Sequence, residues 1–137
     1  MKKRVFGRKF SRDKGARQVL FRSLATSFIK NDQLETTLPK AKSIKGWLDT
    51  LVTKAKKDTL VSRVQLEKEL AQDKVAIDKL LKETSARFKG LNSGFTKMAR
   101  LGVRQGDKAM MVKLTWSRDR QVEQSKPKKS IKKEDVK

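Results

Sequence analysis

The chain has 137 residues, which suits one compact domain with tails better than two independent cores. Its 36 Lys and Arg residues face only 15 Asp and Glu, giving a formal net charge of +21, and it has no cysteine or histidine. This composition excludes disulfides, thiolate zinc sites, cysteine nucleophiles and imidazole-based triads, and it favours a polyanionic partner.

The apolar runs are all shorter than the about 20 residues needed to span a bilayer, and the N-terminus lacks the apolar core of a secretory signal. We therefore expect a protein of the soluble, reducing interior of a cell. A mitochondrial transit peptide is the alternative interpretation of the basic N-terminus.

The densest charge lies in residues 1–22, where nine cationic side chains face one acid, Asp13. The nine are Lys2, Lys3, Arg4, Arg8, Lys9, Arg12, Lys14, Arg17 and Arg22. Residues 1–14 have little apolar content, and we predict that they form a basic extended arm that binds nucleic acid. Phe6 and Phe10 lie between the cations and could stack on bases or fill a protein pocket. The alternative is a disordered, solvated charge run.

From Ala16 onward, apolar residues recur at three- and four-residue spacing, which predicts a helix to Asn31 with a broad buried face. That face consists of Leu20, Phe21, Leu24, Ala25, Phe28 and Ile29. Asp13 is a suitable N-cap, and Asn31 is a suitable left-handed stop. The arm would thus emerge from a fixed, buried helix.

Residues 33–38 alternate in polarity, which predicts a short strand with one buried face. Pro39 suits the first turn of the helix that follows to about Lys57. Trp47 is interpreted as a core or helix-packing residue of this helix, with base stacking as the alternative. The first turns carry positive charge that the helix dipole disfavours, so we expect an external anion near this end. The lysines concerned include Lys40 and Lys42.

Two shorter helices are predicted over residues 58–71 and 74–84, and their evenly mixed charges indicate a solvated surface without an assigned function. Residues 95–101 and 110–116 are predicted to form a β-hairpin around the turn residues 102–107. Cations near its tip either contact phosphate or belong to a solvated turn, and they are Arg100, Arg104 and Lys108.

These segments predict one compact domain of the α/β class (α+β type), with helices packed on a small sheet. The expected element order is helix, strand, three helices, two strands, and the globular domain covers residues 15–117. The arm, residues 1–14, precedes it. Residues 118–137 follow as a basic low-complexity tail of net charge +4, expected to be disordered when free.

Catalytic motifs are weak. The sequence contains no glycine-rich phosphate loop of the Walker or dinucleotide type. Paired acids such as Glu67 and Glu69 lack the apolar surroundings that would tune a general acid. We predict that the protein is not an enzyme and uses neither a cofactor nor a metal. A Ser–Lys nucleophile and a carboxylate-only magnesium site are the alternatives.

Several short motifs occur in a distinctive order after the basic arm and the helix segment QVLFRSLATSFIK. They are TTLPKAK (36–42), LVTKAK (51–56), RF (87–88), GFTK (94–97), Gly102 with Arg104, and GDKA (106–109). As an ordered set across residues 1–116, they resemble bacterial large-subunit ribosomal protein L seventeen. The family usually has an Arg-His-Arg start and further histidines, whereas this chain has Lys2-Lys3-Arg4 and no histidine. It therefore keeps the cationic character without imidazole contacts.

The resemblance implies an α/β fold in the order given above and a structural role in the cytoplasm, within the large ribosomal subunit. It implies binding to large-subunit rRNA, which the protein would help to assemble and stabilise near the peptide exit tunnel. Neighbouring large-subunit ribosomal proteins become expected partners. The rival hypotheses are a histone-like, non-specific DNA- or RNA-binding protein and an RNA-modifying or RNA-cleaving enzyme.

Overall fold

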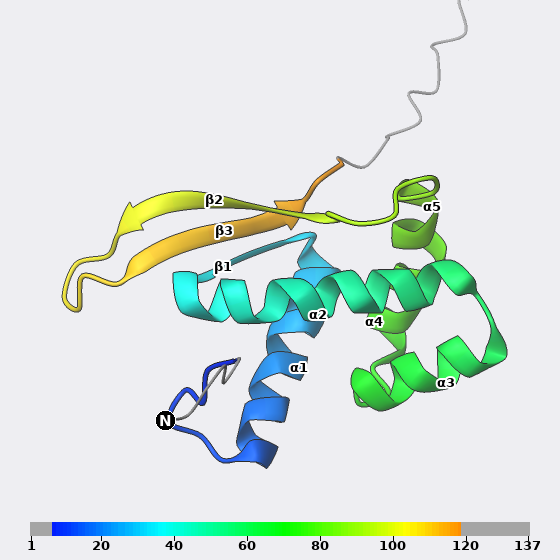
Figure 1. Ribbon diagram of the computed structural model, residues 1–137, viewed down its shortest axis with the longest axis horizontal. Coiled ribbons are helices and arrows are strands. Elements are labelled where there is room, and N and C mark those ends of the chain that lie inside the picture. The colour runs from blue at the N-terminus through cyan, green and yellow to red at the C-terminus, as the bar shows by residue number, and fades with distance from the viewer. Residues whose placement is uncertain (1–6, 119–137) are drawn as a thin grey trace, which may run out of the picture.

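The computed structural model describes residues 7–118 (Figure 1). Lys2, Lys3, Arg4 and the predicted tail beyond Arg118 lie outside the described residues. The elements are α1 (Lys14–Asn31), β1 (Gln33–Thr37), α2 (Leu38–Lys57), α3 (Leu60–Glu69), α4 (Lys74–Lys79), a π-helical turn (Leu80–Thr84), α5 (Ser85–Arg87), β2 (Thr96–Val103) and β3 (Met110–Trp116). The predicted fold class and element order are confirmed, because α4, the π-helical turn and α5 follow one another without a break.

The two ends of α1 have different causes. Asp13 caps the start as predicted, its side chain accepting a hydrogen bond from the Ala16 N–H at 3.3 Å. The predicted stop at Asn31 is wrong by one residue, since Asn31 is still helical and Asp32 adopts the left-handed conformation with φ of 60°. Aspartate tolerates this conformation. Here the Asp32 carboxylate is also held by side chains from distant elements, which the local sequence does not reveal.

The three strands form an antiparallel sheet in the order β1-β3-β2, so the last strand is central. The alternation predicted for β3 is confirmed: Val112, Leu114 and Trp116 are buried. The hairpin is longer than predicted, because β2 extends to Val103. A bulge between Arg100 and Gly102 lets it do so, with Gly102 at φ of 120°.

Helix α2 lies at the centre of the fold, where it contacts all three strands as well as α1 and α3 (Figure 1). Its buried face consists of Ala41, Ile44, Leu48, Leu51, Val52 and Ala55. Thr37 is both the last residue of β1 and the N-cap of α2, so no loop separates the two elements. The aromatic part of the core contains Phe28 and Phe88, whose ring centroids lie 4.4 and 5.5 Å from that of Trp116.

The last helix in the region from α3 to α5 ends later than the sequence predicts. Leu66 and Leu70 are buried, but Leu60, Val61 and Val64 are 78%, 66% and 42% exposed. The helix predicted to end at Thr84 continues to Arg87, because a π-helical turn at Leu80–Thr84 joins α4 to α5. Thr84 itself is buried, and its hydroxyl donates to the carbonyl of Lys79, so this residue does not stop the helix. Within residues 7–118, the structure contains no helix that is both long and apolar enough to cross a membrane.

Candidate nucleic-acid interface

The described part of the arm is a turn fixed against α1. Phe10 and Ser11 have φ of 53° and 50°, and the Arg12 side chain donates to the Phe10 carbonyl at 3.0 Å. The Phe10 ring packs edge-on against Phe21 of α1, with centroids 6.0 Å apart. Phe10 thus fills a protein contact, one of the two roles considered for it. Three cations of the turn remain exposed: Arg8, Lys9 and Arg12.

The three candidate residues on α1 have different surroundings. Lys14, the first helical residue, is exposed, and Arg17 is half-buried. Arg22 donates through Nε to the Glu69 carbonyl and through Nη2 to the Lys68 carbonyl, both at 3.2 Å. These carbonyls lie in the last turn of α3, where they lack helical partners. Arg22 therefore fixes α1 to α3, a role that the sequence did not suggest.

The start of α2 has neither a side-chain cap nor an acidic residue to offset the positive end of the helix dipole. Thr37 forms no side-chain capping hydrogen bond, and the first turn contains no acid. The positive end of the helix dipole therefore adds to the charge of two lysines, Lys40, which is half-buried, and Lys42, which is exposed. The external anion expected near this end stays a prediction, and the uncompensated positive charge is its physical basis.

The hairpin separates its two candidate arginines chemically. Arg100 is exposed on β2 and forms no ion pair within the described part of the chain. Arg104 is engaged by Asp107, with Nε donating to Oδ1 at 2.8 Å and Nη2 to Oδ2 at 2.6 Å. Those hydrogen bonds hold the pKa of Asp107 well below its usual range. Because the Asp107 charge offsets that of Arg104, Arg100 is the more available cation.

Charge is distributed unevenly along the described residues. Residues 58–87 contain six bases and six acids, whereas residues 7–57 contain 13 bases and four acids. Residues 88–118 contain seven bases and one acid. In Figure 1 the arm, the start of α2 and the hairpin tip lie toward one end of the longest axis, and α3, α4 and α5 lie toward the other. We call the part with the arm, the start of α2 and the hairpin tip the cationic end. We call residues 58–87 the neutral end, beside which Lys54, Lys56 and Lys57 of α2 also lie.

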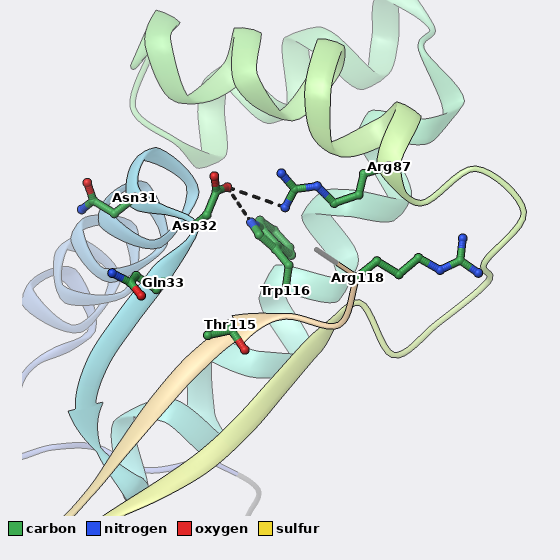
Figure 2. Close-up of a pocket in the computed structure, with 7 residues that line it drawn as sticks. All are labelled: Asn31, Asp32, Gln33, Arg87, Thr115, Trp116 and Arg118. Atoms are coloured by element: carbon green, nitrogen blue, oxygen red, sulfur yellow. Dashed lines mark hydrogen bonds and ion pairs between the residues drawn. The ribbon is translucent and has the colours of Figure 1, made fainter. Parts of the chain in front are cut away.

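A small pocket of about 190 Å³ lies where α1, α5 and β3 meet (Figure 2). Asp32 is its hub, since it accepts from the Trp116 indole N–H at 2.8 Å and pairs with Lys79 at 3.0 Å. Arg87, only 6% exposed, approaches the same carboxylate at 3.8 Å. Arg118 also lines the pocket but extends away from Asp32. The cluster joins distant parts of the chain, and we interpret it as structural.

A larger groove of about 520 Å³ lies between α1, α2 and the end of α3, and we call it the Trp47 groove. It is lined by Gln18, Phe21, Arg22, Ser43, Trp47, Lys68 and Glu69. Trp47 is half-buried and packs against the core, as its helix-packing interpretation predicts. The other part of its surface faces the groove.

The described residues hold no cluster of three or more acidic side chains that could bind a metal ion. What they do present is a small α+β domain with a cationic end and a basic segment leading into it. This combination is characteristic of small nucleic-acid-binding proteins.

Comparison with known proteins gives the family. The family model "Ribosomal protein L17" matches residues 20–116, and the chain belongs to this family. It is 41% identical over 118 residues to large ribosomal subunit protein bL17 of Coprothermobacter proteolyticus, covering 86% of this chain and 100% of that protein. It is 38% and 36% identical to the proteins of the same name from Rickettsia canadensis and Rickettsia africae, each over 110 residues, 80% of this chain and 79% of the relative.

Proposed function

We propose that the chain is a structural constituent of the large ribosomal subunit and binds large-subunit rRNA through its cationic end. The observation that carries this proposal is the charge distribution, because an end with a large excess of Lys and Arg needs a polyanion. Membership in the ribosomal protein L17 family supports rRNA as that polyanion and the bacterial-type ribosome of the cytoplasm as the protein's location. Neighbouring ribosomal proteins are the further partners.

Phosphate and shape contacts should dominate this binding, since the major groove of duplex RNA is too deep and narrow for side chains to enter. Arg8, Lys9 and Arg12 are exposed on a fixed turn and are the first contacts. Lys40, Lys42 and Arg100 follow, with Lys14 and Arg17 between the two groups. Lys2, Lys3 and Arg4 extend the arm and belong to the same proposal.

Two of the predicted contact residues contribute less under this proposal. Arg22 already caps α3, although three of its five N–H donors remain for phosphate. Arg104 is offset by Asp107. We further propose that the protein acts without catalysis, since its chemistry is charge complementarity between exposed cations and RNA.

A pair of matched charge reversals tests the cationic end. Arg8→Glu with Arg12→Glu lowers the net charge by four units, and so does Lys74→Glu with Lys82→Glu on the neutral end. We expect the first pair to weaken binding to a large-subunit rRNA fragment at least tenfold and to flatten its salt dependence. The second pair should change affinity much less, because it acts only through the overall charge.

Equal losses from the two pairs would contradict the proposal, since total charge and not the cationic end would then govern binding. The histone-like alternative is tested by comparing rRNA fragments with B-form DNA at matched salt, where equal affinities would favour it. Sedimentation of cell extracts supplies a third measurement, because a ribosomal constituent must migrate with the large subunit.

A further inference from the structure

The Trp47 groove contains the more exposed of the two tryptophans. Trp116 is 4% exposed, and its indole N–H donates to Asp32 at 2.8 Å. Trp47 is half-buried, and its N–H has no acceptor among residues 7–118. The Trp47 N–H is not among the buried polar atoms that lack a partner, so it is open to solvent. The accessible part of Trp47 therefore offers an aromatic surface and an unused donor to a ligand.

A second aromatic side chain lines the groove. It is Phe21 of α1, which is itself half-buried and against which Phe10 of the arm packs edge-on. The groove volume, about 520 Å³, lies within the range of small-molecule sites. Two aromatic side chains from different helices thus border a space large enough for a flat ring system.

Polar groups also line this space, among them Glu69, whose carboxylate pairs with Lys54. Gln18 and Lys68 carry hydrogen-bonding groups into the lining, and the Ser43 hydroxyl, which donates to the Pro39 carbonyl at 2.9 Å, keeps its own acceptor positions. Arg22 is held in place by the two carbonyls at the end of α3. The lining therefore suits a flat ligand with donors and acceptors on its edge better than an aliphatic side chain.

On both α1 and α2, a cation lies one turn before a residue that lines the groove. Arg17 lies four residues before Phe21 on α1, and Lys40 lies three residues before Ser43 on α2, so each cation shares a helix face with a lining residue. An aromatic platform flanked by cations is the arrangement with which proteins bind unstacked bases of single-stranded RNA. An apolar side chain of a protein partner would gain nothing from those cations.

We propose that the Trp47 groove binds one unstacked base of RNA, which stacks on the Trp47 indole while Arg17 and Lys40 contact the adjoining phosphates. This inference rests on the proposed binding of rRNA. It adds a base-contacting site to an interface that otherwise depends on charge and shape.

The test uses the full chain labelled with ¹⁵N, whose two tryptophans give two indole N–H signals that Trp47→Phe assigns. The probes are a single-stranded oligoadenylate of about ten nucleotides, within the usual site size, and inorganic polyphosphate of equal charge at the same ionic strength. Oligoadenylate should shift the Trp47 signal and leave that of Trp116 in place. Polyphosphate, which has charge but no bases, should give less than a tenth of that shift.

Affinity supplies the second measurement. Trp47→Ala should weaken oligoadenylate binding roughly 5- to 150-fold, the usual effect of removing one stacking platform, and leave polyphosphate binding unchanged. Trp47→Phe keeps an aromatic ring and should retain most of the affinity. If Trp47→Ala does not fold, the signal shifts of the unmodified chain and the affinity of Trp47→Phe still decide the question.

Several outcomes would overturn the proposal. If oligoadenylate binds without moving the Trp47 signal, the groove does not hold a base, and the proposed rRNA binding stands. If Phe6→Ala alone shifts that signal in RNA-free protein, the chain's own arm fills the groove. If neither oligoadenylate nor an rRNA fragment binds, the proposed function itself fails.

Discussion

Replacing Asp32 by asparagine tests whether the cluster in Figure 2 holds the fold together. Asparagine tolerates the left-handed conformation and can still accept from the Trp116 indole, so the change removes little but charge. Lys79 and Arg87 then lose their shared carboxylate while only 14% and 6% exposed. Breaking a buried ion pair in this way typically costs about 3–5 kcal/mol.

The lower end of that range applies here. Lys79 keeps a hydrogen bond to the Lys30 carbonyl at 2.7 Å, and Arg87 is already 3.8 Å from Asp32. We therefore expect Asp32→Asn to lower the free energy of unfolding by about 3 kcal/mol. For a domain of this size the midpoint temperature should fall by about 10–20 °C. Urea titration followed by near-ultraviolet circular dichroism measures the free energy, and calorimetry the temperature.

Asp58→Asn is the matched control. Asp58 is also a left-handed helix C-cap, with φ of 44°, and it also pairs with an arginine, Arg63, at 2.7 Å. Arg63 and Asp58 are both more than half exposed, so the same chemical change should alter stability little. Equal effects of Asp32→Asn and Asp58→Asn would refute the argument, because burial of the cations would then not matter.

Three further predictions concern acid–base linkage at two aspartates and the core. Burial raises the pKa of Asp49, so its charge opposes folding at neutral pH, and Asp49→Asn should stabilise the protein at pH 7 but not below about pH 4. The hydrogen bond from Lys30 lowers the pKa of Asp73, so Asp73→Asn should remove stability that is present above about pH 4 and lost as pH falls. Urea titrations across pH 2–8 measure the effects of Asp49→Asn and Asp73→Asn. Trp116→Ala should cost about 3–5 kcal/mol of unfolding free energy, whereas the Arg8 and Arg12 reversals should leave it nearly unchanged, as thermal unfolding would show. Opposite signs at either aspartate, or unfolding caused by the arm reversals, would contradict these arguments.

Most of the fold could be predicted because its signals are local. The spacing from Leu20 to Ile29 predicted α1, Asp13 predicted its start, and the alternation around Leu114 predicted the buried face of β3. The π-helical turn at Leu80–Thr84 could not be predicted, since its sequence is compatible with an ordinary α-helix. The left-handed stop at Asp32 depends on Trp116, which lies 84 positions further along the chain.

The sequence predicted which cations belong to the candidate interface, but not which of them are already bound by other groups of the protein. Composition identified the cations, and it could not show that Arg22 is bound to carbonyls of α3. The pairing of Arg104 with Asp107 had a local signal, because the two residues lie three positions apart in a turn. The groove beside Trp47 had none, since it forms between three segments of the chain that lie far apart in sequence, such as those of Arg22, Ser43 and Lys68.

Strand β1 joins α2 directly at Thr37, without a loop. This junction holds Lys40 and Lys42 of α2 in a fixed orientation relative to Arg100 of β2. A strand places its side chains by alternate faces and a helix turns 100° per residue, so the register of β1 sets the direction in which Lys40 and Lys42 point. Because β1 pairs with β3 and β3 pairs with β2, the position of Arg100 is fixed relative to β1 as well. One residue inserted between Thr37 and Leu38 would rotate the lysines about a quarter turn relative to the hairpin without removing a single charge. The spacing between these lysines and Arg100 is thus fixed by the absence of a loop.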